Sequence, residues 1–125
     1  MIETELAAWL ATNVPLVASR IYPSRLPQSV VLPAITYLKV SGPRVPTHQG
    51  PSGLAKPRFQ ISCWDEKYLD AKAVAVQVRQ ALNCYSGMMG ALRVGVALLR
   101  GERDLVDPAR NIHQIALDFE VAHEE

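Results

Sequence analysis

The stretch RFQISCWDEKYLDAKAVAVQVRQAL, residues 58–82, places a short alternating segment directly before a long amphipathic one. In the first part, apolar and polar side chains alternate, which predicts a β-strand over residues 58–64 with one buried face. In the second part, apolar side chains return every three or four residues, which predicts a helix over residues 66–83 with Asp65 as its N-cap. The apolar stripe of this helix consists of Ala71, Val74, Ala75, Val78, Ala81 and Leu82. A strand that leads into such a helix predicts a sheet covered by helices.

Four further segments complete the predicted fold. Helical spacing of apolar residues predicts a helix over residues 3–12, and alternation predicts strands over residues 34–41, 91–100 and 112–123. The order is helix, strand, strand, helix, strand, strand. We therefore expect an α+β fold with a four-stranded, mainly antiparallel sheet and two helices packed on one face. The length of 125 residues predicts a single domain, residues 1–125.

Two proline-rich segments lie outside these elements. Residues 20–33 contain three prolines, and each proline favours extended geometry in the residue before it, so we expect an ordered but irregular connector. Residues 42–57 contain four prolines and no regular periodicity, and they join the first two predicted strands. Connections of this length within a compact domain are usually functional or disordered, so we expect a long loop there.

Charge is distributed unevenly along the chain. The net charge is +1, but no Asp or Glu occurs in residues 7–64, whereas from Asp65 onward ten acidic residues outnumber seven basic ones. The basic residues of the first half are Arg20, Arg25, Lys39, Arg44, Lys56 and Arg58. Such asymmetry indicates a face for a polyanion or an acidic partner, unless both halves interleave and the charges mix on the folded surface. No uncharged run is long enough to predict a membrane span.

Motifs that bind cofactors or metals are absent from the sequence. It contains no GxxxxGK[ST], GxGxxG, HExxH or CxxC pattern, and Cys63 and Cys84 lack metal-ligand spacing with His48, His113 or His123. We expect no catalytic residue, no cofactor and no metal. The enzyme alternative would use Cys63 as a nucleophile with His48 as its base, but the strand pattern places Cys63 on the apolar face, where thiols are normally inert.

The proline motifs and the strand-to-helix junction carry a resemblance to a known family. Tyr22-Pro23, Leu26-Pro27, Leu32-Pro33-Ala34 and Ser41-Gly42 precede the strand of residues 59–64 and its Ala-rich helix, and the chain closes with IALDFEVAH, residues 115–123. In these features the chain resembles the tail completion proteins of long-tailed bacteriophages and related prophages, from about residue 17 to residue 121. It departs from them in VPTHQGPSG, residues 45–53, where the family pattern is more polar.

The resemblance implies a structural virion protein without catalytic activity. It implies a homo-oligomer, a hexameric ring at the head-proximal end of the tail tube, that is assembled in the host cytoplasm. The ring would end tube polymerisation and would have the tail tube protein, the head connector or a neck protein, and DNA passing through its channel as partners. The alternatives are another neck ring or tube-like subunit, such as a head-closure protein, or, from a different class, a small thiol-dependent or hydrolytic enzyme.

An assembly of this kind needs contact surfaces on each subunit. We expect part of the connector to lie at a heterologous subunit contact, where its prolines expose a rigid apolar ridge that includes Tyr22, Leu26 and Val30. We also expect the long, cationic loop of residues 42–57 to be mobile in the free subunit and to become ordered against a neighbour, the tube end or the DNA channel. Trp64 lies either under the second helix or at a subunit contact. The residues predicted at the subunit or tube interface are Tyr22, Pro23, Leu26, Val30, Arg44, His48, Lys56, Arg58 and Trp64.

Overall fold

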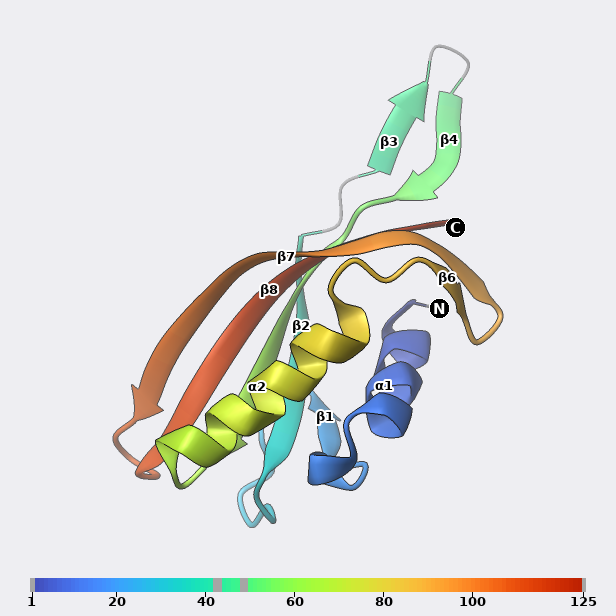
Figure 1. Ribbon diagram of the computed structural model, residues 1–125. Coiled ribbons are helices and arrows are strands. Elements are labelled where there is room, and N and C mark those ends of the chain that lie inside the picture. The colour runs from blue at the N-terminus through green and yellow to red at the C-terminus, as the bar shows by residue number, and fades with distance from the viewer. Residues whose placement is uncertain (1, 42–43, 48–49, 125) are drawn as a thin grey trace.

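The computed structural model describes residues 2–41, 44–47 and 50–124 (Figure 1). Its helices are α1 (Ile2–Asn13), the short 3-10 helix η1 (Pro15–Val17) and α2 (Tyr68–Leu82). Its strands are β1 (Ile21–Pro23), β2 (Ala34–Ser41), β3 (Arg44–Thr47), β4 (Gly50–Ala55), β5 (Arg58–Asp65), β6 (Gly87–Met89), β7 (Leu92–Asp107) and β8 (Ile112–Glu124).

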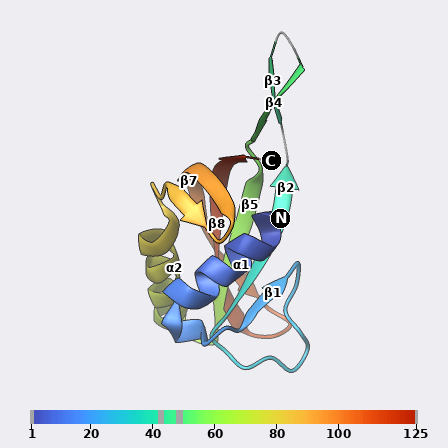
Figure 2. The same cartoon turned by 90° about the vertical axis from the view of Figure 1, so that its right-hand side faces the viewer.

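The strand β5 lies in the middle of the sheet. It pairs antiparallel with β2 on one side and with β8 on the other, so that Ile61 stands between Tyr37 and Leu117. Beyond β8 the sheet continues through antiparallel β7 and then β6, and at the opposite edge β1 runs parallel to β2. These six strands form one curled sheet, and both helices lie on the same side of it (Figure 2).

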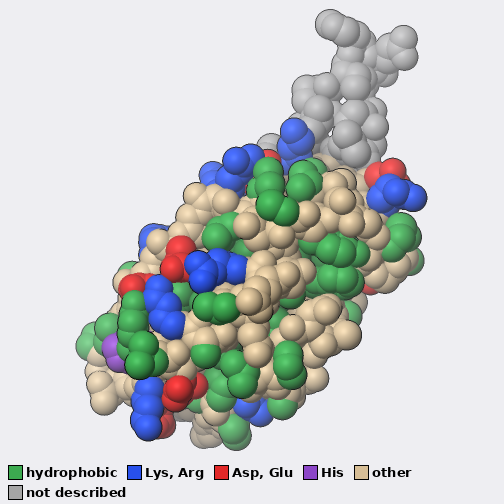
Figure 3. All heavy atoms as spheres, in the orientation of Figure 1, with side chains coloured by type: hydrophobic (Ala, Val, Ile, Leu, Met, Phe, Trp, Pro, Cys, Tyr) green, Lys and Arg blue, Asp and Glu red, His purple; other side chains and the backbone are tan. Residues whose placement is uncertain are grey.

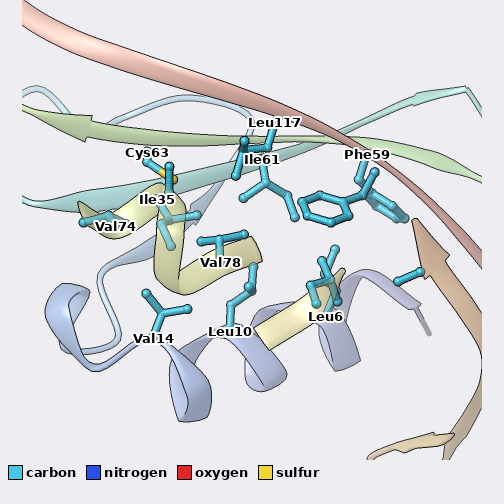
Figure 4. Close-up of a cluster of buried hydrophobic side chains, with 14 of the residues drawn as sticks. Leu6, Leu10, Val14, Ile35, Phe59, Ile61, Cys63, Val74, Val78 and Leu117 are labelled. Carbon is cyan, nitrogen blue, oxygen red and sulfur yellow. The ribbon is translucent and has the colours of Figure 1, made fainter. Parts of the chain in front are cut away.

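The helix-facing side of the sheet is the apolar core (Figure 4). It forms where the alternating apolar residues of β5 and β8 meet the apolar stripes of the two helices. Fully buried members are Leu6, Leu10, Ile35, Phe59, Ile61, Cys63, Val74, Val78, Leu117 and Phe119. Because Phe59 and Phe119 face each other across β5 and β8, truncating either ring to alanine costs about 3–5 kcal/mol.

Trp9 links α1 to α2 and to the residues that follow it. The indole Nε1 of Trp9 in α1 donates a hydrogen bond to the carbonyl oxygen of Ala81 in α2, at 3.1 Å, and its ring lies 4.3 Å from the Tyr85 ring. Both helices lie within two residues of the predicted limits. The predicted N-cap is wrong, because α2 begins at Tyr68 with Lys67 in the cap position, while Asp65 Oδ1 accepts a hydrogen bond from the Glu66 N–H.

The predicted four-stranded sheet in the order helix, strand, strand, helix, strand, strand is also wrong. The described residues form eight strands, and the sheet is mixed because β1 is parallel to β2. The connector joins the sheet through backbone hydrogen bonds, from Ser24 N–H to Tyr37 O and from Ile35 N–H to Arg20 O, both at 2.9 Å. At the other edge, β6 forms in the glycine-containing segment YSGMMG, residues 85–90, and β7 continues past Arg100, with a register shift between Leu99 and Gly101. Alternation did not predict these additional strands, because prolines, glycines and the register shift interrupt the pattern.

The predicted long loop is wrong as well, because most of it is a β-hairpin. β3 and β4 pair antiparallel, with Pro46 opposite Pro51. At the base of the hairpin, Leu54 and Ala55 pair with Glu124 and His123 of β8, so that β4 continues the line of β5 along β8. The hairpin projects from the body at one end of the sheet (Figures 1 and 2). Paired prolines carry no strand signal in a sequence, which is why the hairpin was not predicted.

The turn between β6 and β7 provides a test of the packing around α1. Gly90 has a φ of 62°, in the left-handed region, and a Cβ at this position would overlap the Glu5 carboxylate of α1. We expect Gly90→Ala to lower the free energy of unfolding by about 1–2 kcal/mol, because an L side chain is strained at this φ. Urea denaturation followed by tryptophan fluorescence measures the change.

Gly95 in β7 is the matched control. A Cβ at Gly95 would meet the Ala122 carbonyl oxygen at 3.5 Å, which is an ordinary contact, and the backbone there needs no positive φ. Gly95→Ala should therefore leave stability unchanged or slightly raised. Equal losses for the two variants would contradict the conformational requirement at Gly90.

Candidate functional site

The predicted interface residues separate into two groups on the folded protein. The first group lies around the connector, against the sheet face that points away from the helices, and consists of Tyr22, Pro23, Leu26, Val30 and Trp64. The second group lies around the hairpin and its junction with β5, and it contains Arg44, Lys56 and Arg58. His48 lies outside the described residues. The structure therefore offers two candidate surfaces rather than one.

The connector covers a second, smaller apolar cluster. Leu26, Ala34 and Ile112 are buried in it, and Tyr22, Val30, Leu32 and Trp64 pack around them. Trp64 does not lie under α2. Its indole Nε1 donates a hydrogen bond at 2.9 Å to the Thr36 hydroxyl, which is buried on the same face of the sheet. Leu26 is only 6% exposed, so the prediction of an exposed ridge that includes Leu26 is wrong, and this residue anchors the connector instead.

Two arginines border this cluster. The guanidinium of Arg20 donates to the carbonyl oxygen of Pro33 at 2.8 Å, and that of Arg110, from the turn between β7 and β8, donates to Pro27 O at 3.3 Å. The open hollow beside them, here called the connector hollow, is lined by Tyr22, Pro23, Arg25, Leu26, Pro27, Gln28 and Arg110. Arg25 and Arg110 were not predicted as site residues. No sequence pattern links Arg110 to the connector, because the turn that carries it is 83 residues from Pro27.

The second surface lies where the hairpin meets β5. Lys56 and Arg58 are exposed, and Arg58 lines a shallow hollow together with Val40, Gln60, Arg103 and Asp118. Arg103 donates to Gln60 Oε1 at 3.1 Å and lies 3.6 Å from Asp118 Oδ1. At this surface, therefore, cations of the first half mix with acids of the second half.

The outward face of the sheet between these surfaces carries paired polar side chains, beside Leu38, which lies opposite Gln60 and is exposed. The Ser62 hydroxyl accepts hydrogen bonds from Gln60 and Gln114, and Arg100 lies 3.2 Å from Glu120 on the neighbouring strand. Each of these polar side chains is paired across strands, so the charges of this face are largely balanced.

The carboxylates of β7 have structural partners. Asp104 of β7 accepts a hydrogen bond from Tyr68 Oη at 2.7 Å and lies 2.9 Å from Lys72 Nζ, which also contacts Glu102 at 3.0 Å. The Lys72 and Tyr68 hydrogen bonds lower the pKa of Asp104, and the two carboxylates raise the pKa of Lys72. Asp107 accepts backbone hydrogen bonds from Ala109 and Arg110. These carboxylates hold α2, β7 and a turn in place.

Within the described part of the chain, no three His, Cys, Asp or Glu side chains group as metal ligands. No helix formed by the described residues is long and apolar enough to cross a membrane. Cys63 is fully buried in the core, where desolvation, with a smaller contribution from the Glu102 charge, raises the pKa of its thiol. A thiol in that environment stays protonated and is a poor nucleophile.

The fold defines a small α+β protein with a curled mixed sheet, and the hairpin and the connector hollow are its candidate contact surfaces. The chain belongs to the tail completion protein gp17 family, whose family model matches residues 4–124. It is a structural protein of bacteriophage virion assembly, and its location is the virion tail. The resemblance predicted from the proline motifs is thus confirmed.

A similar structure occurs in the virion of the native gene transfer agent (GTA) particle. One of its chains matches with a TM-score of 0.74 and 20% sequence identity, over 99% of this chain and 92% of that chain. At this identity the likeness concerns the fold. No curated protein matches this sequence.

The two cysteines should differ in reactivity. Because burial raises the pKa of Cys63, its thiol should not react with Ellman's reagent at pH 8 in the native protein, whereas exposed Cys84 should react. One equivalent is expected per native chain and two per chain in denaturant. The Cys84→Ser variant, as control, should give no reaction until it unfolds, and rapid reaction of the native variant would show that Cys63 is accessible.

Proposed function

We propose that subunits of this protein form a ring, a hexamer, at the head-proximal end of the tail tube. There the ring ends tube polymerisation and joins the tail to the head connector or a neck protein. Membership of the tail completion family, whose proteins are structural components of the phage tail, supports this proposal. The observation that carries the finer proposal is the projecting β3–β4 hairpin. A two-stranded hairpin is marginally stable alone in water, so it gains its stability from a partner surface.

A ring also needs two different contact patches on each subunit, because a heterologous interface closes by rotation. The connector hollow and the hairpin lie on separate parts of the body and supply unlike surfaces. The hairpin and its base carry Arg44, Lys56 and Arg58, which face an acidic surface of a neighbour, the tube end or the DNA channel in the assembled ring. A modest number of cations suits a channel through which DNA passes without adhering.

The protein acts in this proposal without catalysis. Cys63 is buried in the core. The carboxylates of β7 form hydrogen bonds or ion pairs with Tyr68, Lys72 and backbone amides of the turn. Cys63→Ala and Cys84→Ala variants should therefore support normal tail assembly, after allowance for the loss of packing at Cys63.

Removing the hairpin tests the proposed function. We expect replacement of residues 44–53 by a short Gly-Ser turn to leave the domain folded, because the core and the pairing of Leu54 and Ala55 with β8 remain. Tails made with this variant should lose length control or fail to join heads, as seen by electron microscopy of particles. The thermal unfolding midpoint of the purified variant checks that the body is intact.

A single substitution in β3 that keeps the hairpin gives the control. Arg44→Lys retains the charge and should form normal particles. Infectious particles with tails of normal length from the hairpin-deleted variant would contradict the proposed role of the hairpin.

A further inference from the structure

The first turn of α2 presents an apolar side chain to solvent. Leu69 is 77% exposed, more than any other large hydrophobic side chain of the described residues, and Tyr68 beside it is 39% exposed. The core-facing stripe of α2 begins with Ala71, so Leu69 points away from the core. Exposed Glu66 and Asp70 flank it. Lys67, next to Glu66, is exposed as well, and cations and carboxylates lie close together around the start of α2 (Figure 3). The start of α2 is thus an apolar knob bordered by two carboxylates and one cation.

The connector hollow has the complementary composition. Tyr22, Pro23, Leu26 and Pro27 give it an apolar lining, and exposed Arg25 and Arg110 are its charged members. No acidic side chain lines it. Its apolar lining and its positive charge suit an apolar side chain that is flanked by carboxylates.

The knob and the hollow lie on opposite faces of the sheet. Tyr68 packs edge-on against His113, whose neighbours Ile112 and Gln114 point to the other face, where Ile112 belongs to the connector cluster. The two surfaces therefore cannot meet within one subunit. They can meet between two copies in a head-to-tail arrangement, which is the kind of contact that a closed ring requires.

We propose that Leu69 of one subunit enters the connector hollow of the next, with Glu66 and Asp70 facing Arg25 and Arg110. This inference rests on the proposed ring and names one of its interfaces. The partner is a second copy of this chain, because an apolar knob with two carboxylates complements an apolar hollow with two arginines. Burying one leucine side chain corresponds to at least about a tenfold gain in association.

Crosslinking in the full-length protein tests the contact. In a Cys84→Ser background, Leu69→Cys and Gln28→Cys place one thiol on the knob and one at the hollow, and both positions are exposed. A short bismaleimide should join the two variants when they are mixed under ring-forming conditions or on tail tubes. Val76→Cys, two turns further along the exposed side of α2, replaces Leu69→Cys as the matched control and should not crosslink to Gln28→Cys.

Charge exchange gives an independent measurement. Asp70→Arg or Arg25→Asp alone should reduce ring formation at least about tenfold, and both changes in one chain should restore it. Leu69→Asp should likewise abolish rings, whereas Val76→Asp should not. Rings that form normally from Leu69→Asp, or an absence of the crosslink in assembled rings, would overturn this contact and leave the proposed function standing. If the unmodified protein forms no ring on tail tubes, both proposals fail.

Discussion

β5 must satisfy two different environments, because its side chains alternate between the helix-covered core and the outward face of the sheet. Phe59, Ile61 and Cys63 pack in the core. On the other face, Trp64 donates a hydrogen bond to Thr36 and packs against the connector cluster. A shift of one residue in its pairing with β2 or β8 would exchange these faces and would bury Arg58 and Gln60 under the helices. The helices, the connector and the polar face all depend on this register.

Because β5 is central, its register determines how the strands on either side of it are placed. β8 extends past the end of β5 and receives β4, so the hairpin is attached to the most thoroughly paired strand of the sheet. Its attachment nevertheless consists of two residue pairs, which lets it project as a separate arm. The connector, in contrast, is tied down by the Trp64 cluster and by the Arg20 and Arg110 hydrogen bonds, and so it forms a fixed surface. The protein thus presents one arm and one rigid hollow.

The sequence was sufficient for the parts of the fold that repeat with a regular period. Both helices and the faces of β5 and β8 follow from apolar spacing, because burial requires that spacing. The strands β1, β3, β4 and β6 contain prolines or glycines, and they are held by backbone hydrogen bonds that carry no side-chain signal. The role of the connector as a contact surface stays a prediction, and the burial of Leu26 and the contribution of Arg110 depend on contacts between segments far apart in the chain.

The asymmetry of charge along the chain has a similar explanation. Pairing of β5 with β8 brings Arg58 opposite Glu120 and Gln60 opposite Asp118, so that the sheet itself mixes the basic first half with the acidic second half. An excess of one sign remains at two places: Arg25 and Arg110 border the connector hollow, and exposed Glu66 and Asp70 outnumber exposed Lys67 around Leu69. Interactions between exposed charges are screened beyond about one Debye length, roughly 8–10 Å in physiological salt. In the proposed contact these charges would orient two subunits that already touch, while the apolar contact between Leu69 and the hollow would supply most of the affinity.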